Sequence, residues 1–301
     1  MTLNQTDVLH KNGVAYALDR SYSASGRLAL QHQLWKEVTV KPILPRILAC
    51  LRSPKGGSAD AASADAAAEV NIADVGTGTG IWAVDIARGL STQEVKFKVH
   101  GFDISDAQFP PAHALPAGVQ LSVADALAPP AEELCGAFDF VHVAQFAGVR
   151  ALGEDPSPVM DHAMALLKPG GWIQWDEWAQ DGKGKIEILS QGPSPRCDAA
   201  LALTAKVLPQ WVLDVPGHLT KCGFLEAGRH DFIPPSHLLP QLTSLWYMTA
   251  DEIIQCGFEE PTRSALMEAL AGAYAETRDK AIGAMFKTCP SSNIGQKPNI
   301  A

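Results

Sequence analysis

The stretch VNIADVGTGTGIWAVDIARGL, residues 70–90, decides the fold of this chain. It opens with a short apolar run, which predicts a buried strand, and it closes with apolar residues at helical spacing. Between them, Gly76 and Gly78 allow positive φ angles and a close approach of the backbone to a ligand, and Gly80 allows a tight turn into the helix. The unpaired N–H groups at the helix start can receive a polar ligand. Taken alone, such a turn binds dinucleotides, nucleosides or no ligand at all.

Strands and helices alternate on the C-terminal side of this turn. Residues 156–171 are expected to form a helix, because a proline opens the segment and Pro-Gly-Gly closes it. Apolar runs predict strands at residues 70–75, 96–104, 118–125, 137–146 and 172–178. This alternation predicts an α/β fold with a Rossmann-like, doubly wound parallel sheet.

The segments outside the alternating region divide the chain further. Residues 1–55 are expected to form an N-terminal helical cap, because apolar residues recur there at helical spacing. Residues 56–69 consist of small and acidic residues without a large apolar side chain, which predicts a flexible loop. The core is expected over residues 70–301, with helical lid elements at about 183–280.

Within the C-terminal part, the expected elements are less regular. The segments expected to be helical are 197–208, 237–258 and 261–280, and a strand is expected at 224–233. Residues 285–289 and the tail are expected to form a final hairpin at the edge of the sheet.

Composition and net charge limit the classes of protein to which this chain can belong. Of the 301 residues, 47% are apolar and 19% are charged, which is ordinary for a globular protein with a full core. The formal charge of −9, from 24 basic and 33 acidic residues, argues against a nucleic-acid binder. No apolar run reaches the roughly 18 residues of a membrane span, and no signal peptide is predicted. The six cysteines form no C-x-x-C pair, so we expect reduced thiols and a cytoplasmic location.

Two acidic residues after the glycine turn indicate a nucleoside ligand. Asp103 ends the second strand, 23 residues beyond Gly80, where a carboxylate can accept hydrogen bonds from both ribose hydroxyls. Asp125 ends the third strand, where it can bond an adenine amino group. An enzyme that binds a nicotinamide dinucleotide is the weaker hypothesis, because its usual G-x-G-x-x-G pattern is one residue longer than the G-x-G-x-G of this turn.

The ordered motifs resemble the class I S-adenosylmethionine-dependent methyltransferases. They are Asp74 before the glycines, Asp103, Asp125 and the string LLKPGG at 166–171. Three longer strings resemble the fungal secondary-metabolism methyltransferases, which include a velvet-complex regulator and the N-methyltransferase of gliotoxin-type pathways. These strings are YSASGRL with LQHQLW (22–28 and 30–35), IADVGTGTGIWAVDIA (72–87) and LLKPGGWIQWDE (166–177). Where that family often has H-I-R-x-L after the fourth strand, this chain has HVAQF (142–146).

The resemblance implies a sheet of the class I methyltransferase type, with N-terminal helices and C-terminal helical additions, and S-adenosyl-L-methionine as the cofactor. It implies that the glycines hold the methionine portion, that Asp103 binds the ribose and that Asp125 binds the adenine. Ile104 and Leu127 are expected to flank the adenine faces. The full expected set of cofactor-binding residues is Asp74, Gly76, Thr77, Gly78, Gly80, Asp103, Ile104, Asp125, Ala126 and Leu127.

The acceptor is expected beyond the carboxyl ends of the fourth and fifth strands, under the N-terminal helices. His142, Glu177 and His32 are the expected catalytic residues, because an imidazole or a carboxylate can take a proton from the acceptor. Each of them also fits a packing or surface role. No cluster of acidic ligands predicts a metal. The expected substrate-binding residues are Tyr16, Tyr22, Arg27, Gln31, Gln145, Phe146, Trp175 and Trp246.

These features predict methyl transfer from S-adenosylmethionine to an O, N or S atom of a small secondary metabolite, and they leave the acceptor atom open. One alternative is a regulatory or scaffold protein that binds S-adenosylmethionine and acts through partners. Another is a cyclase that uses the cofactor without transferring its methyl group. The expected partner is a small-molecule acceptor, with neither nucleic acid nor membrane, and the oligomeric state is left open.

Overall fold

The structure is a computed structural model that describes most of the chain. The described residues are 18–52, 69–90, 96–149, 152–178, 186–204 and 209–299. The loop expected at 56–69 lies outside the described residues apart from Glu69, and so does Tyr16.

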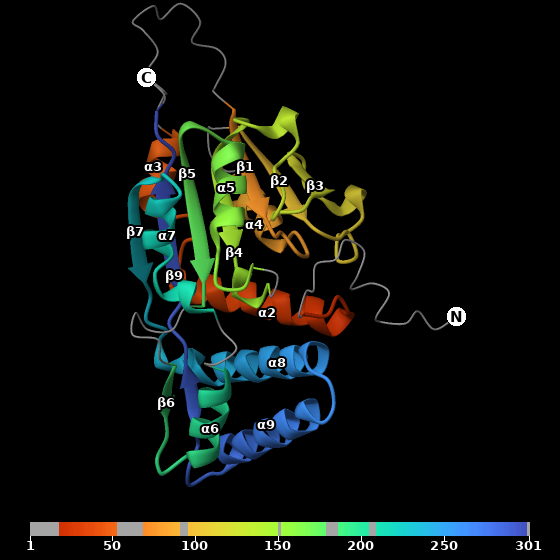
Figure 1. The fold of residues 1–301 in the computed structure, drawn as a ribbon, viewed down its shortest axis with the longest axis vertical. Coiled ribbons are helices and arrows are strands. Elements are labelled where there is room, and N and C mark those ends of the chain that lie inside the picture. Colours follow the sequence, from red (N-terminus) through yellow and green to blue (C-terminus); the bar gives the residue numbers. More distant parts are fainter. Residues whose placement is uncertain are drawn as a thin grey trace, which may run out of the picture.

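A seven-stranded sheet forms the centre of the fold, in the order β3-β2-β1-β4-β5-β9-β7 (Figure 1). The strands are β1 (Val70–Val75), β2 (Phe97–Asp103), β3 (Val119–Val123), β4 (Phe138–Ala144), β5 (Leu167–Glu177), β7 (Leu225–Asp231) and β9 (Ser291–Gln296). Strands β1 to β5 pair in parallel, and β9 runs antiparallel to both of its neighbours. The predicted Rossmann-like, doubly wound sheet is confirmed. Its strand order changes direction between β1 and β4, where sheets of this kind bind ligands.

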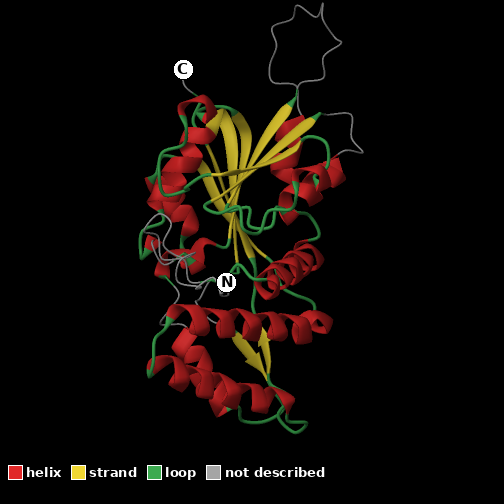
Figure 2. Cartoon of the chain, turned by 90° about the vertical axis from the view of Figure 1, so that its right-hand side faces the viewer, coloured by secondary structure: helices red, strands yellow, loops and turns green. Residues whose placement is uncertain are grey.

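Helices cover both faces of the sheet (Figure 2). They are α3 (Pro45–Arg52), α4 (Ile81–Leu90), α5 (Ser157–Leu166) and α7 (Val215–Lys221). Successive residues of a strand point to opposite faces. Accordingly, Ile72 packs in the core beneath α3 and α4, and Ala73 packs in the core beneath α5 and α7.

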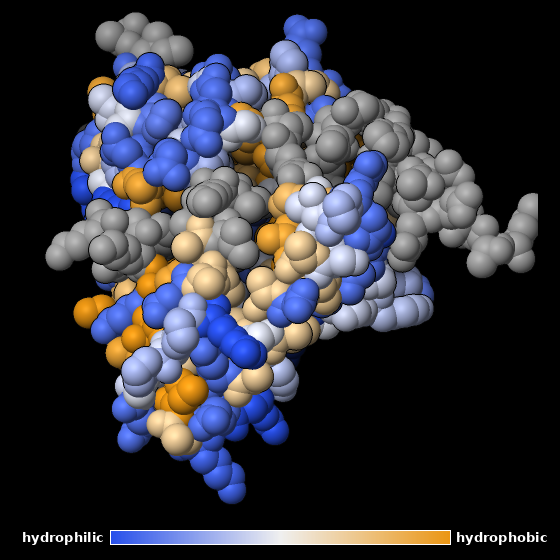
Figure 3. All heavy atoms as spheres, turned by 60° about the horizontal axis from the view of Figure 1, so that its bottom comes forward, coloured by the Kyte–Doolittle hydropathy of each residue, from blue (hydrophilic) through white to orange (hydrophobic). Residues whose placement is uncertain are grey.

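A second, mainly helical body lies beyond the carboxyl ends of the strands (Figures 1 and 2). Its elements are α6 (Pro195–Thr204), α8 (Leu239–Gly257), α9 (Thr262–Arg278), β6 (Glu187–Leu189) and β8 (Met285–Lys287). Between this body and the sheet lies α2 (Tyr22–Thr39), whose Leu34 and Val38 share a core with Leu242 and Leu245 of α8. On the face turned toward the viewer in Figure 3, hydrophilic and apolar side chains are intermixed.

Short 3₁₀ turns complete the connections. They are η1 (Ala112–Ala114), η2 (Glu132–Leu134), η3 (Phe146–Gly148), η5 (Gln210–Leu213) and η6 (Ser236–Leu238). Among the described residues, no helix combines the length and the apolar character that a membrane crossing requires.

The predicted edge hairpin at the C-terminus is wrong. β8 pairs with β6 in a separate two-stranded sheet, and β9 inserts between β5 and β7. The burial of β9 explains the insertion, because the residues Ser291–Gly295 are all buried. Buried backbone N–H and C=O groups need hydrogen-bond partners, and a strand obtains them on both sides only inside a sheet. Similarly, β5 begins at Leu167 rather than at residue 172, because the Pro-Gly-Gly segment continues as strand.

Close packing around β9 generates a stability prediction. A Cβ atom on Gly295 would lie 2.9 Å from Cβ of the buried Phe224. We expect Gly295→Ala to lower the free energy of unfolding by about 1–3 kcal/mol through overpacking, measured by urea denaturation. Gly228→Ala on the neighbouring strand is the control, since its Cβ would meet only Ile294 Cγ1, at 3.9 Å, and a backbone oxygen at 4.0 Å. Equal stability of the two variants would contradict the packing argument.

Candidate active site

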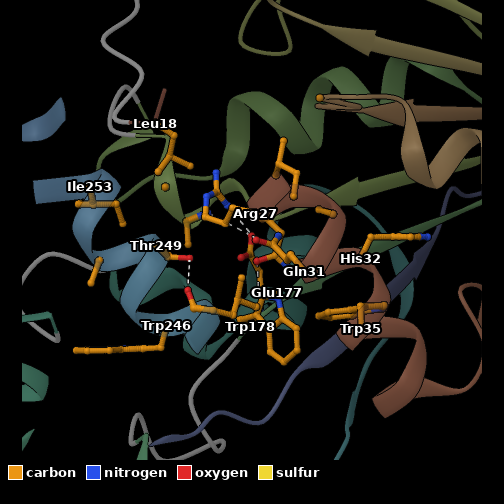
Figure 4. Close-up of a pocket in the computed structure, with 18 of the residues that line it drawn as sticks. Leu18, Arg27, Gln31, His32, Trp35, Glu177, Trp178, Trp246, Thr249 and Ile253 are labelled. Carbon is orange, nitrogen blue, oxygen red and sulfur yellow. Dashed lines mark hydrogen bonds between the residues drawn. The ribbon is translucent and has the colours of Figure 1, made fainter. Parts of the chain in front are cut away.

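A cavity of about 330 Å³ opens at the carboxyl ends of β1, β4 and β5. Its walls come from α2, from the glycine turn and strand ends, and from α8 and α9. Figure 4 shows Arg27, Gln31 and Glu177 near the middle of this site, with Thr249 and Ile253 of α8 on another side. The cavity therefore lies where the strand order changes direction, between the sheet and the helical body.

The glycine turn between β1 and α4 has the conformation that only glycine adopts readily. Gly76, Gly78 and Gly80 have φ angles of 74°, 56° and 73°, in the left-handed region. A Cβ on Gly76 would lie 2.6 Å from Phe146 Cε2, and one on Gly80 would lie 2.8 Å from Leu121 Cδ1. Gly76 and Gly78 line the cavity, whereas Gly80 serves the packing of the turn against β3.

Asp103, at the end of β2, lines the cavity beside this turn. Its Oδ2 accepts a hydrogen bond from the Gly78 N–H at 2.9 Å, and its Oδ1 accepts one from the Ser105 N–H at 3.2 Å. The Arg20 guanidinium lies 3.9 Å from Oδ1. Burial raises the pKa of Asp103, and the Gly78 hydrogen bond and the Arg20 charge oppose that rise. The carboxylate is thus oriented by the turn and keeps lone pairs for ligand hydroxyls.

The residues expected around an adenine lie next to Asp103 but outside the cavity. The Ala124 N–H donates to the Asp103 carbonyl oxygen at 2.8 Å, so the chain after β3 runs beside the end of β2. Asp125 Oδ1 accepts a hydrogen bond from the Leu127 N–H at 2.9 Å. The expected residues that do not line the cavity are Gly80, Ile104, Asp125, Ala126 and Leu127.

His142 of β4 lies between two carboxylates. Its Nδ1 is 2.7 Å from Asp74 Oδ1, its Nε2 is 3.2 Å from Asp176 Oδ2, and Trp82 stacks on its ring at 3.9 Å between centroids. Burial acts to lower the pKa of His142, but the hydrogen bonds and charges of Asp176 and Asp74 outweigh it and raise the pKa to about 9. The imidazole is therefore a cation at neutral pH with both nitrogens engaged. The expectation that His142 takes a proton from the acceptor stays a prediction, and in this structure both of its ring nitrogens face carboxylates.

Further hydrogen bonds extend this cluster in two directions. Thr77 Oγ1 donates to Asp74 Oδ2 at 2.6 Å, which ties the glycine turn to it. On the other side, Gln174 Nε2 donates to Asp176 at 3.1 Å and to the Pro42 carbonyl oxygen at 3.0 Å. The cluster thus connects the N-terminal segment with the glycine turn through β5, β4 and β1.

Glu177, at the end of β5, is a buried carboxyl that lines the cavity. Its Oε1 accepts hydrogen bonds from Trp175 Nε1 and the Phe146 N–H, each at 2.8 Å, and from the Ala147 N–H at 3.3 Å. Burial raises the pKa of Glu177 to about 7, against the opposing effect of these donors. A carboxyl group with this pKa gives up or accepts a proton near neutral pH.

His32, the third expected catalytic residue, is turned toward α4. Its Nε2 lies 3.2 Å from Asp85 Oδ2, and Lys36 Nζ lies 2.9 Å from Asp85 Oδ1. Burial lowers the pKa of His32, and Asp85 opposes that effect. His32 lines the cavity and also joins α2 to α4 through the contact of its Nε2 with Asp85. Its expected role in proton transfer stays a prediction.

An ion pair joins α2 to α8 beside the cavity. Arg27 Nε donates to Glu252 Oε2 at 2.6 Å, and Arg27 Nη1 donates to Gln31 Oε1 at 3.2 Å. The Asp19 N–H donates to Glu252 Oε1 at 2.8 Å. Arg27 and Gln31, both expected at the acceptor site, line the cavity. Through the ion pair of Arg27 with Glu252, they also hold α2 against α8 beside it.

Three other expected substrate-binding residues lie elsewhere. Tyr22 is 98% exposed, because it starts α2 away from the helix face that contacts the rest of the molecule. Phe146 and Trp175 are buried in the core, where their rings meet edge to face at 5.8 Å, and neither lines the cavity. Gln145 and Trp246 do line it.

The structure adds lining residues that the sequence did not single out for the site. Trp35 and Trp178 meet edge to face at 5.3 Å. On α8, Leu245, Thr249 and Ile253 recur every fourth residue, which places them on one helix face. That spacing was visible in the sequence, but it does not distinguish a cavity wall from a core. Among the described residues, no group of three or more His, Cys, Asp or Glu side chains is placed to hold a metal ion.

The methyltransferase domain family matches residues 32–252 of the chain. Among curated relatives, Methyltransferase grgD of a Penicillium species is 41% identical over 36% of this chain and 38% of the relative. The N-methyltransferase tcpN of Claviceps purpurea is 28% identical over 52% of this chain and 50% of the relative. The N-methyltransferase verN of Clonostachys rogersoniana is 36% identical over 35% of each chain. The chain thus spans half or less of the length of these relatives.

Similar solved structures include the cyclase SpnF, with 21% identity and a TM-score of 0.46 over 77% of this chain and 76% of that chain. A phosphoethanolamine N-methyltransferase of Haemonchus contortus has 15% identity and a TM-score of 0.46 over 99% of this chain and 61% of that chain. These likenesses carry no argument about activity. The family match covers most of the chain, and the chain belongs to the methyltransferase domain family.

The buried histidine generates a pH prediction. The pKa of His142 rises from 6.5 to about 9 on folding, so its contribution to stability is complete below pH 6.5 and is lost as the pH rises through 9. We expect the melting temperature of the natural protein to fall more steeply from pH 6.5 to 9 than that of His142→Gln. Circular dichroism melts over this range measure the difference.

The same substitution at the exposed His113 is the control, and we expect its melting temperature to follow the natural protein. Parallel curves for the natural protein and His142→Gln would show that the imidazole carries no such linkage.

Proposed function

We propose that this chain is an S-adenosylmethionine-dependent methyltransferase that methylates an O, N or S atom of a small secondary metabolite. The observation that carries the proposal is the glycine turn held to Asp103 at the wall of the cavity, in a chain of the methyltransferase family. The names of the fungal relatives support methyl transfer as the reaction, and the resemblance of the sequence to fungal secondary-metabolism methyltransferases supports a secondary metabolite as the acceptor. No disulfide joins any of the six cysteines, all of which the structure describes, and this supports the cytoplasm as the proposed location.

The residues at the glycine turn fit S-adenosylmethionine. Side chains at Gly76 and Gly78 would need the left-handed conformation, so the backbone there stays open to a ligand. Trp82 lines the same cavity, and its buried Nε1 has no hydrogen-bond partner within the described part of the chain. We propose that the turn holds the methionine portion of the cofactor and that Asp103 holds its ribose. When bound, the cofactor supplies an electrophilic methyl group on a sulfonium.

The chain itself positions the acceptor and handles its proton. The Arg27–Glu252 pair joins α2 to α8 beside the cavity, and we propose that this contact limits the access of water to the bound acceptor. Glu177 is held by three N–H donors at Oε1, which fixes the carboxyl at the wall of the cavity. We propose that Glu177 accepts the proton of the acceptor heteroatom. We propose Glu177 for this role in preference to His142, because Asp74 and Asp176 occupy both nitrogens of the imidazole.

Replacing Asp103 tests the cofactor assignment. We expect Asp103→Ala to weaken binding of S-adenosylmethionine and S-adenosylhomocysteine by about 1–3 kcal/mol, because charge-assisted hydrogen bonds are lost. Isothermal titration calorimetry measures the change in affinity, with NAD as a negative control that should not bind. The exposed Asp106, three residues further on, provides the control Asp106→Ala, which should bind as the natural protein does. Unchanged affinity in Asp103→Ala would remove the ribose assignment.

Replacing Glu177 tests the proton acceptor. The carboxylate fraction of Glu177 grows as the pH rises through about 7, so methyl transfer to a hydroxyl should accelerate over pH 6 to 8. We expect Glu177→Gln, which keeps an oxygen for the same donors, to be slower by about 10²–10⁴ and to lose this pH dependence. Release of S-adenosylhomocysteine measures the rate.

Glu187→Gln, at an exposed glutamate outside the cavity, should retain the natural pH profile. A natural profile in Glu177→Gln would exclude Glu177 as the base. Binding of S-adenosylmethionine without any release of S-adenosylhomocysteine across an acceptor screen would favour the cyclase or regulatory alternatives.

A further inference from the structure

The charged side chains that line the cavity are confined to one end of it. They belong to α2, the segment before α2, the glycine turn and the ends of the strands, and Glu177 is the last of them along the chain. Beyond Trp178, the described lining residues are apolar except for Thr249 and Thr288. The cavity is therefore divided into a charged end, which holds Glu177 and the glycine turn, and an uncharged end in the helical body.

The uncharged end reaches between two helices. Ile253 and Phe258, from α8 and its C-terminal end, and Leu266, Ala269 and Leu270 from α9 form what we call the apolar slot. All of these except Leu270 are only half-buried. Apolar surface that stays accessible to water gains free energy when an apolar ligand covers it.

A packed core stands behind the slot and fixes its shape. Leu270 belongs to the same core as Phe286 and Tyr247. Trp246, which lines the cavity, stacks on Phe286 at 4.1 Å between ring centroids. A wall supported in this way does not collapse into the space beside it, because protein cores are close-packed. The slot is thus a preformed apolar site adjoining the charged end.

The charged residues that line the cavity are not placed to neutralise a charged ligand group bound in the apolar slot. Arg27 is already paired with Glu252 of α8, at 2.6 Å, and the two Asp residues of the His142 cluster are hydrogen-bonded to the imidazole. The described residues of the apolar slot are all apolar, so none of them could form an ion pair with a buried charge. A charged group placed there would lose its hydration without compensation.

We propose that the acceptor is an amphiphilic molecule whose uncharged apolar arm, aliphatic or aromatic, occupies the apolar slot while its reacting heteroatom faces Glu177. This inference rests on the proposed methyltransferase function and adds the chemical class of the acceptor. The length of the apolar arm then determines affinity, and α9 determines which arms fit.

A series of 4-n-alkylphenols from ethyl to hexyl tests the proposal by calorimetry on the full chain saturated with S-adenosylhomocysteine. Each added methylene should tighten binding about fourfold, the equivalent of about 0.8 kcal/mol per buried CH₂. 6-(4-Hydroxyphenyl)hexanoic acid, which ends in a carboxylate, should bind at least tenfold more weakly than 4-hexylphenol.

Two variants of α9 locate the arm. Ala269→Phe fills the slot and should abolish the gain from longer chains while leaving S-adenosylhomocysteine binding unchanged. Ala265→Phe, at an exposed position of α9 outside the cavity, should preserve the gain. Normal binding of S-adenosylhomocysteine by both variants shows that they fold.

The outcomes separate the two proposals. Affinity that does not depend on chain length, equal binding of the carboxylate-ended phenol, or an Ala269→Phe variant that keeps the chain-length gain would each overturn the apolar-arm proposal. Failure of the natural protein to bind S-adenosylhomocysteine would instead overturn the proposed function.

Discussion

The hydrogen-bonded cluster of Asp74, His142 and Asp176 is the interaction on which the rest of the site depends. It joins the neighbouring strands β1, β4 and β5 at their carboxyl ends, and all three side chains are buried. Two buried carboxylates without a cation between them would be strongly destabilising. The imidazolium of His142 lies between the two carboxylates with Trp82 stacked on its ring, and its positive charge offsets their repulsion. Through Thr77 the cluster also holds the glycine turn, so the turn proposed to hold the cofactor and the central sheet share one hydrogen-bond network.

A second constraint follows from the insertion of β9. The chain enters the helical body after β5, forms α8 and α9, and returns through β8 to place β9 beside β5. The helical body is therefore attached to the central sheet at the strand whose end carries Glu177. Together with the Arg27–Glu252 ion pair, this attachment sets the walls of the acceptor end of the cavity. The proposed acceptor end is thereby separated from the proposed cofactor end, which lies at β1 and β2.

The sequence predicted the parallel core well, because strands and helices there carry their own signals within 10 to 20 residues. The branched apolar run before Gly76 and the helical spacing after Gly80 are local, and both elements formed as predicted. The C-terminal hairpin was predicted wrongly, since the pairing of β9 with β5 and β7 depends on partners 60 or more residues away. Side-chain roles followed the same division. Asp103 lines the cavity as its place at a strand end implied, whereas Trp175, expected at the acceptor site, packs in the core.

By itself, the sequence determined the unit of strand, glycine turn and helix, and the acidic residue Asp103 at the end of the next strand. It also indicated a class I methyltransferase through its resemblance to that family. These features are encoded over short distances by periodicity and by residues with few alternatives, such as glycine at positive φ. Only the tertiary structure decided that His142 is enclosed by two carboxylates, that His32 faces Asp85, and that α8 and α9 build an apolar slot beside Glu177. The physical reason is that these arrangements come from contacts between distant segments, such as Arg27 with Glu252, 225 residues apart. No local pattern specifies which of two compatible partners a side chain will meet.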